Sequence, residues 1–266
     1  MSPSLSESIR IGLLPDRVIF ARYARGLRPR LLEKGAFSVD AGIAEEPWRG
    51  PVAALPKLLQ AHAPRAADAT LVLSNHFVRY ALLGANDRLS NREEWLEYAS
   101  HHFEKTYGAR ARDWDIQISE SGAARPRVAS AIDKALLAAA AAAFKGVRVR
   151  LRSIKPYLMV AFNRALPSMP QSSFWFVAQE PGRLLLGLVR DGLWQSVRAR
   201  QASALWCEDL PRMVGRENAL LDSEPCRDVL VSALDPVELV ASNGFKFITS
   251  PSPLAGEERA YAMVFA

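Results

Sequence analysis

Residues Phe174–Arg200 read FWFVAQEPGRLLLGLVRDGLWQSVRAR and predict a meander of three short β-strands. The strands and the turns between them follow one another in the order Trp175–Gln179, Glu180-Pro181-Gly182, Leu184–Arg190, Asp191-Gly192 and Leu193–Arg198. An Asp-Gly pair between two apolar runs is a strong hairpin signal, because both residues tolerate the positive φ that a tight turn requires. The last two strands are therefore expected to form an antiparallel hairpin.

The N-terminal part of the chain repeats this plan. Its strand-like runs, broken by Pro15-Asp16 and by residues 26–29, are Ile9–Leu14, Arg17–Ala24 and Arg30–Val39. Helix-forming sequence follows both triplets of strands. A meander used twice predicts an α/β protein of two related lobes, 9–167 and 168–266, joined by a linker at residues 167–173. Each lobe is expected to hold a mixed sheet that starts with the meander and is flanked by helices.

The composition is that of an ordinary globular protein: 266 residues, 49% hydrophobic and 23% charged. No apolar run approaches the roughly 20 residues that cross a bilayer, and the N-terminal sequence MSPSLSESIR lacks the apolar core of a signal peptide. The two cysteines, Cys207 and Cys226, have no C-x-x-C spacing, which argues against a disulfide scaffold and a zinc site. We therefore expect a cytoplasmic protein without direct membrane insertion.

The net charge of +6 comes mainly from arginine. A basic surface is one way to bind nucleic acid. However, residues 147–152 read VRVRLR, and such alternation is typical of a strand with one face in solvent. Aromatic residues also do not interleave with the arginines, as they do on platforms for single-stranded nucleic acid. A solvated strand face is the favoured interpretation, and nucleic acid is not an expected partner.

One histidine lies where α/β proteins often place functional loops. Ala69–Leu83 contains a near-continuous apolar run typical of a buried strand, and Ser74-Asn75-His76 follows that run. Catalysis by His76 would need a nucleophile or a second histidine at a recognisable spacing, and the sequence shows neither. A local packing or hydrogen-bonding role for His76 is the favoured interpretation.

Several helices are predicted outside the meanders. Ser90 and Glu93 form an S-x-x-E capping box, which predicts the start of a helix that ends before Gly108. A second helix is predicted over Val128–Phe144, because this segment contains six consecutive alanines and alanine is the best helix former. A short helix is predicted at Pro236–Ala241.

The order of these elements is typical of actin-like folds. Four stretches carry a closer resemblance: ATLVLSNHFVRYALL at Ala69–Leu83, SAIDKALL at Ser130–Leu137, SIKPYLMVAFNRA at Ser153–Ala165 and GRLLLGLVRDGLWQSVR at Gly182–Arg198. In these stretches the chain resembles the bacterial PilM and GspL-type proteins of type IV pilus and type II secretion assembly platforms, including their MSHA-pilus relative. The resemblance implies two actin-like (RNase H-like) lobes that bind a short cytoplasmic segment of a membrane partner.

The chain departs from the nucleotide-binding members of the actin-like group. Those proteins hold Mg-ATP with two Asp-x-Gly phosphate hairpins and a glycine-rich adenosine loop. Here the resemblance aligns the hairpins with Arg10-Ile11-Gly12 and with Phe176–Gln179, and the adenosine loop with Ser250–Glu257, which has a single glycine. The phosphate-loop positions Gly12 and Gly182 are thus degenerate. No cofactor is expected, although an unconventional Mg-ATP site stays open.

The first functional hypothesis is a non-catalytic scaffold of a pilus or secretion platform. It would bind a cytoplasmic segment of an inner-membrane protein by strand addition or by docking of a helix in a groove. GspL-type proteins carry their own membrane helix and periplasmic domain. Neither is expected here, so the protein would be cytoplasmic and would reach the membrane through its partner.

Three residues are expected to contact that partner: Arg190, Trp194 and Arg198. The two arginines would meet an acidic segment if they share a face at the edge of a sheet. Core packing is the simpler role for Trp194 and for Trp206. A homo-oligomer also stays open.

The second hypothesis is an enzyme, either an ATPase or a sugar-kinase-like phosphotransferase with an unconventional nucleotide site. It would need a carboxylate for metal binding or base catalysis, and Asp133 and Glu217 are the acidic residues to inspect. Both lie in helical patterns, and charged residues on helices are mostly exposed, so a surface position is favoured for each. No catalytic residue and no metal ligand is assigned.

Overall fold

The computed structural model describes residues 7–24, 26, 29–40, 46–63, 66–120, 122, 125–169, 173–221, 224–235, 239, 244–250 and 256–265. The chain forms two compact units, and each combines segments that are distant in sequence. Unit 1 comprises Met1–Val78, Ile132–Val160 and Tyr261–Ala266, and unit 2 comprises Arg79–Ala131 and Ala161–Ala260. The predicted division into lobes 9–167 and 168–266 stays a prediction.

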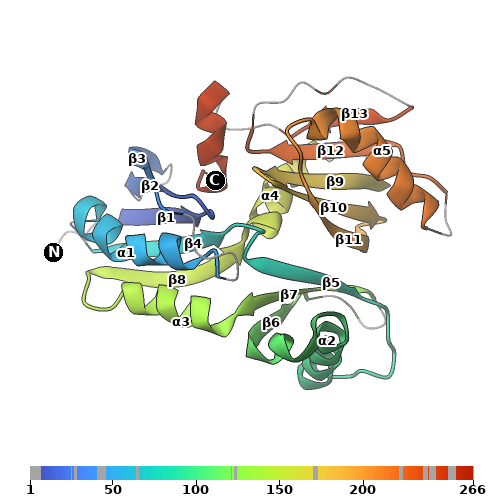
Figure 1. Cartoon of the computed structure of the whole chain (residues 1–266), viewed down its shortest axis with the longest axis horizontal. Coiled ribbons are helices and arrows are strands. Elements are labelled where there is room, and N and C mark those ends of the chain that lie inside the picture. The colour runs from blue at the N-terminus through green and yellow to red at the C-terminus, as the bar shows by residue number, and fades with distance from the viewer. Residues whose placement is uncertain are drawn as a thin grey trace. The chain divides into compact units, whose positions relative to one another are not determined.

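Unit 1 contains a mixed sheet in which five described strands have the order β3-β2-β1-β4-β8 (Figure 1). The strands are β1 (Glu7–Leu13), β2 (Arg17–Ala24), β3 (Arg30–Ser38), β4 (Ala67–Leu73) and β8 (Val149–Pro156). The N-terminal meander is therefore confirmed. Strand β1 pairs antiparallel with β2 and parallel with β4, and β4 pairs parallel with β8. This topology puts β1 and β4 in the middle of the sheet.

The two faces of this sheet are covered by elements from different parts of the chain. Helix α1 (Arg49–His62) lies on one face and buries Val52, Leu55 and Leu59. On the opposite face Met263, the last residue of the 3-10 helix η3 (Gly256–Met263), lies beside Gly12, and the next residue, Val264, is fully buried. The backbone oxygen of Val264 accepts a hydrogen bond from the Tyr23 hydroxyl at 3.4 Å. The C-terminus thus completes the core of unit 1.

A half-buried ionic network ties α1 to the meander. Arg22 Nη1 lies 2.8 Å from Glu7 Oε2, and Arg22 Nη2 lies 3.0 Å from Glu33 Oε2. His62 Nδ1, at the end of α1, lies 2.6 Å from Glu33 Oε1. Burial raises the pKa of the Glu33 carboxyl, but the hydrogen bonds from His62 and Arg22 outweigh it and hold that pKa below its ordinary value. The network therefore links three strands and one helix.

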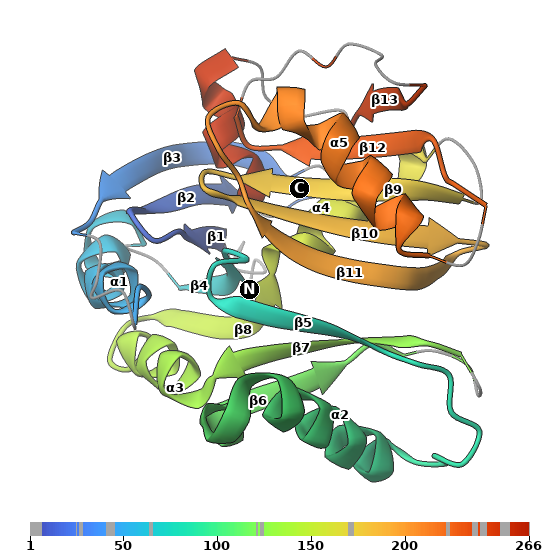
Figure 2. The same cartoon turned by 45° about the vertical axis from the view of Figure 1, so that its right-hand side comes forward.

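Unit 2 repeats the same topology in its larger sheet. The five described strands have the order β11-β10-β9-β12-β13, where β9 is Ser173–Glu180, β10 Arg183–Arg190, β11 Leu193–Gln201, β12 Asp228–Ala233 and β13 Lys246–Thr249. Strand β9 pairs antiparallel with β10 and parallel with β12. The predicted hairpin at Asp191-Gly192 is confirmed, with φ of 50° and 75° at these residues. Helix α5 (Trp206–Ala219) covers one face of this sheet (Figure 2).

A small sheet with the order β5-β7-β6 forms the other part of unit 2. Its strands are β5 (Val78–Leu83), β6 (Trp114–Ile118) and β7 (Arg127–Asp133), and α2 (Arg92–Tyr107) followed by η1 (Gly108–Asp113) packs beside them (Figures 1 and 2). The predicted capping box is wrong by one residue. Asn91 is the N-cap, and its Oδ1 accepts from Glu94 N at 3.0 Å, while Ser90 N donates to Glu94 Oε2 at 2.6 Å. The N-cap is thus an asparagine in place of the predicted serine, and the glutamate also lies one position later.

Three further predictions have different outcomes. The single helix predicted over Val128–Phe144 is wrong, because β7 extends to Asp133 and α3 (Lys134–Ala143) begins only there. The buried strand predicted at the apolar run of Ala69–Leu83 is confirmed as β4, which ends before Ser74, and β5 follows after the turn. The short helix predicted at Pro236–Ala241 lies, apart from residue 239, outside the described residues.

A buried asparagine side chain links several elements of unit 2 by hydrogen bonds. Asn218, near the end of α5, accepts hydrogen bonds through Oδ1 from Trp175 Nε1 at 3.0 Å and from Cys226 N at 3.2 Å. Its Nδ2 donates to Cys226 O at 2.9 Å. Since Trp175 is fully buried, water cannot replace this acceptor. One amide therefore joins the helix to β9 and to the segment before β12.

We expect Asn218→Ala to lower the free energy of unfolding by about 3 kcal/mol, because it leaves buried donors and an acceptor without a partner. Urea denaturation measures the loss. Asn163→Ala, at an exposed position of α4 (Tyr157–Ala165), is the matched control and should change stability by less than about 0.5 kcal/mol. A loss below about 1 kcal/mol for Asn218→Ala would contradict this stabilising role of the Asn218 hydrogen bonds.

Candidate functional site

The carboxyl ends of the parallel strands in unit 1 carry the polar residues that the sequence singled out. Ser74 and Asn75, directly after β4, are buried. Asn75 Oδ1 accepts a hydrogen bond from Leu158 N at 3.0 Å, and Ser74 Oγ accepts from His76 N at 3.1 Å. These two hydrogen bonds of Ser74 and Asn75 thus stabilise the turn after β4 and the start of α4. His76 lies in that turn.

Asp16 lies in the neighbouring β1–β2 turn. Its carboxylate is bound by the guanidinium of Arg17, with Nη2 to Oδ2 at 2.8 Å. This hydrogen bond is the main cause that lowers the pKa of Asp16, and His76 adds a weaker electrostatic contribution. Across the described part of the chain, no group of three or more His, Cys, Asp or Glu side chains could hold a metal ion.

Gly12 is the last but one residue of β1 and pairs with Ile19 of β2 and Val72 of β4. A Cβ added at Gly12 would lie 2.8 Å from Ile19 Cγ1 and 2.8 Å from Met263 Sδ. The absence of a side chain therefore allows the sheet to pack closely against η3. A phosphate cradle needs backbone N–H groups that face open space, and the surroundings of Gly12 do not fit that role.

The corresponding positions of the second meander are also occupied by protein contacts. Phe176 and Ala178 are buried, and Gln179 Nε2 donates to Asp235 Oδ2 at 2.6 Å while Gln179 Oε1 accepts from Asp235 N at 3.2 Å. Gly182 has φ of 74° in the β9–β10 turn. The preceding Pro181 has no N–H group that could donate to a phosphate. This turn does not fit Mg-ATP either.

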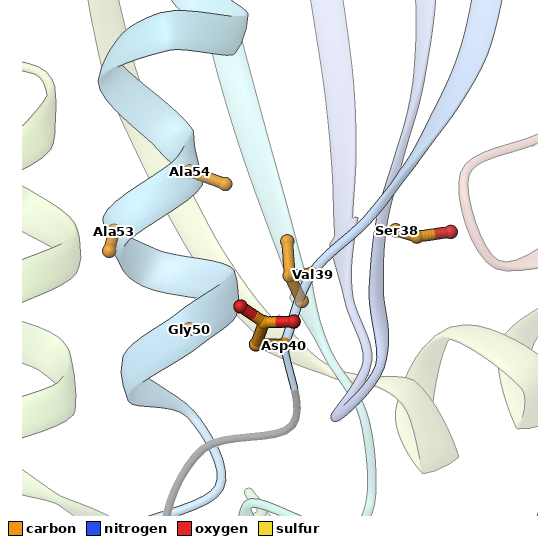
Figure 3. Close-up of a pocket in the computed structure, with 6 residues that line it drawn as sticks. All are labelled: Ser38, Val39, Asp40, Gly50, Ala53 and Ala54. Atoms are coloured by element: carbon orange, nitrogen blue, oxygen red, sulfur yellow. The ribbon is translucent and has the colours of Figure 1, made fainter.

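A hollow of about 510 Å³ lies in unit 1 between the end of β3 and the first half of α1 (Figure 3). The described residues that line it are Ser38, Val39, Asp40, Gly50, Ala53 and Ala54. Figure 3 shows the Ser38 hydroxyl turned away from α1, so Asp40 is the polar side chain that faces the helix. A nucleotide carries negatively charged phosphates. The described residues of this hollow offer small side chains and one carboxylate, and none of them is positively charged.

The three predicted partner-contact residues do not share one face. Arg190 and Arg198 lie on the α5 face of the sheet, because Arg198 pairs with Leu186, which belongs to the core beneath α5. Trp194 lies on the opposite face, where its ring centroid is 4.6 Å from that of Phe162. The guanidinium of Arg190 donates to the backbone oxygen of Glu224. The surface of Arg198 and the packing site of Trp194 are therefore distinct.

The two carboxylates considered for enzymatic roles have structural contacts. Asp133 Oδ1 accepts from Ala135 N at 2.7 Å and is the N-cap of α3. The surface position expected for Glu217 is wrong. Its side chain is buried, with 4% of the residue exposed, and forms an ion pair with Arg200 of β11. Helical periodicity alone could not reveal this partner, because it lies on a strand. Trp206, by contrast, is the first residue of α5 and belongs to the core between this helix and the sheet, as the simpler interpretation had it.

No protein-family model matches the chain, and no curated protein matches it. Solved structures do. The cytoplasmic domain of EpsL, an inner-membrane component of the type II secretion system of Vibrio cholerae, is similar with a TM-score of 0.61 and 12% identity, over 97% of this chain and 93% of that one. A chain of the PilM-PilN type IV pilus biogenesis complex is similar with a TM-score of 0.60 and 12% identity, over 86% and 82% of the two chains.

A Bacteroides thetaiotaomicron protein with an actin-like ATPase fold is similar to the same extent, with a TM-score of 0.60 and 11% identity over 88% of this chain and 84% of that one. Identities this low show a shared fold. The chain thus has the actin-like fold, and the structural resemblance to PilM and to a type II secretion component is confirmed at that level. None of the helices formed by described residues combines the length and the apolar character that spanning a bilayer requires.

Gly12→Ala should lower the free energy of unfolding by about 2 kcal/mol, because the new methyl group overpacks the contact with Ile19 and Met263. Chemical denaturation measures this loss. Met263→Ala and the double variant complete a double-mutant cycle. The sum of the two single-variant losses should exceed the loss of the double variant by about 1 kcal/mol. Strictly additive losses would contradict a direct contact between Gly12 and the C-terminal segment.

Proposed function

We propose that this protein is a non-catalytic scaffold on the cytoplasmic side of a type IV pilus or type II secretion-like assembly platform. It binds a cytoplasmic segment of an inner-membrane partner and reaches the membrane through it. The observation that supports this most is the similarity to the EpsL cytoplasmic domain over 97% of this chain. The similarity to a chain of the PilM-PilN complex supports the same role, since that structure is an assembly of two pilus proteins.

The proposal includes the absence of nucleotide chemistry. At the positions where the resemblance expects phosphate hairpins, Gly12 packs against Ile19 and Met263, and Gln179 is hydrogen-bonded to Asp235. These contacts use the space and the polar groups that a phosphate would need. An ATPase or a phosphotransferase is the alternative, and it would require a site built from other residues.

Binding to a membrane protein can be measured with inverted inner-membrane vesicles from the bacterium that encodes the chain. We expect saturable co-sedimentation of the purified protein with these vesicles. Protease treatment, which removes cytoplasmic segments of membrane proteins, should abolish it. Protein-free liposomes of the same lipid composition are the control, because a protein of net charge +6 also attracts anionic lipid. Equal binding to liposomes and vesicles would refute a protein partner.

Nucleotide binding can be measured by thermal shift with Mg-ATP. We expect no change of Tm at millimolar nucleotide. A ligand at about one hundred times its Kd stabilises the native state by about 2.7 kcal/mol, so binding in this range would be visible. A clear upward shift would contradict the proposed absence of nucleotide chemistry and favour the enzyme alternative.

A further inference from the structure

Strand β11 forms an edge of the larger sheet of unit 2. It pairs with β10, and no other described strand pairs with its outer side. A register shift near Leu188 interrupts the pairing at Gln195, and the pairing is regular from Ser196 to Gln201. An edge strand presents backbone N–H and C=O groups that can pair with another chain. The regular part of β11 is therefore a surface for strand addition.

The direction of the backbone groups along β11 follows from one hydrogen bond. Ala202 N donates to Gly182 O at 3.2 Å, so the amide of residue 202 points toward β10. Because these groups alternate along an extended strand, those of Arg198 and Arg200 also point toward β10. The N–H groups of Val197, Ala199 and Gln201 point to the open edge.

The side chains of this segment alternate between two different faces. Arg198 and Arg200 pair with Leu186 and Leu184 and lie on the α5 face, while Val197 and Ala199 lie on the other face. Arg200 is bound by the buried Glu217. Arg198 is exposed and forms no ion pair with any described residue. On one face the edge thus presents the exposed guanidinium of Arg198 beside the Arg200–Glu217 ion pair, and on the other the buried Val197 and the exposed Ala199.

We propose that the regular part of β11 takes an extended segment of the partner as a further strand, in which acidic and apolar residues alternate. Acidic side chains would lie beside Arg198 and Arg200, and apolar side chains beside Val197 and Ala199, because neighbouring strands place side chains at the same two-residue period. This inference rests on the proposed scaffold function and specifies the segment that the scaffold binds.

A second copy of the chain is a poorer occupant of this edge. When two sheets join at their edges with matching faces, residues of the same face lie opposite each other. Two β11 strands would therefore place Arg198 and Arg200 against the same arginines of the other copy. Like charges opposite each other in a sheet are destabilising. The arginines select against self-association and for an acidic strand.

The binding of a fluorescent peptide of alternating Glu and Val residues, followed by anisotropy, tests the proposal on the full chain. A peptide of the same composition with its Glu and Val residues in separate blocks is the control and should bind at least about tenfold more weakly, because it cannot match both faces. Binding of the alternating peptide should weaken as salt rises.

Two pairs of variants separate backbone pairing from charge. Ala199→Pro removes an outward N–H group without removing a hydrogen bond to β10, and should raise the peptide Kd about tenfold, whereas Ala199→Thr keeps that N–H and should change it less than about twofold. Arg198→Glu should raise the Kd about tenfold. Arg150→Glu, an equal change of charge at an exposed position of β8 in unit 1, should have little effect.

N-methylated peptides make the test independent of how the variants fold. In an added strand every second peptide amide faces β11. Methylation of that set should abolish binding, and methylation of the set that faces away should leave binding unchanged. Equal effects of the two sets, or equal affinities of Ala199→Pro and Ala199→Thr, would overturn strand addition at β11.

The vesicle assay keeps the two proposals apart. If Ala199→Pro and Arg198→Glu sediment with vesicles as the wild type does, the β11 surface is wrong and the scaffold function stands. If the wild type does not sediment with vesicles, the scaffold function is wrong, and the peptide measurements still decide whether β11 takes an acidic strand. Loss of vesicle binding in both variants, with the Tm unchanged, supports both proposals.

Discussion

In both units the sheet depends on one parallel pairing that the chain can make only after a crossover. Strand β1 pairs with β4, and β9 pairs with β12, so the first strand of each meander becomes an interior strand. An interior strand needs apolar side chains on both faces, and most of β1 and β9 is buried accordingly. Closing these long loops costs entropy, which the burial of two faces offsets.

This interior position bears on what the meanders can do. The segments that the resemblance aligns with phosphate hairpins lie within or directly after β1 and β9, where close packing is required for the fold. At Gly12 the space is taken by Ile19 and by Met263 of the C-terminal segment. At Gln179 the side-chain amide is held by Asp235. The same topology that positions nucleotide loops in actin-like ATPases is here stabilised by contacts between protein groups.

The meanders could be predicted from the sequence because turn residues such as Asp191-Gly192 act locally. The predictions that were wrong depend on contacts between residues that are distant in the sequence. Strand β7 contains Ala129 and Ala131, which favour a helix by propensity, but small side chains fit the sheet face that packs against the aromatic residues of α2. The burial of Glu217 depends on Arg200, an ion pair between a helix and a strand that no periodic pattern reports. The candidate surface on β11 likewise required the pairing register.

The two meanders share a topology but differ in the charges at their outer strands. In β3, Glu33 is bound by Arg22 and His62, and Lys34 Nζ lies 5.5 Å from the ring centroid of Tyr261, so both charges are engaged within unit 1. In β11, Arg198 forms no ion pair within the described part of the chain. A charge left exposed beside open backbone groups favours one kind of added strand over others. The proposed role of β11 therefore rests on side-chain charge as well as on open backbone groups. The two outer pairs also differ in where the register shifts, between Arg22 and Tyr23 in β2–β3 and between Leu188 and Val189 in β10–β11.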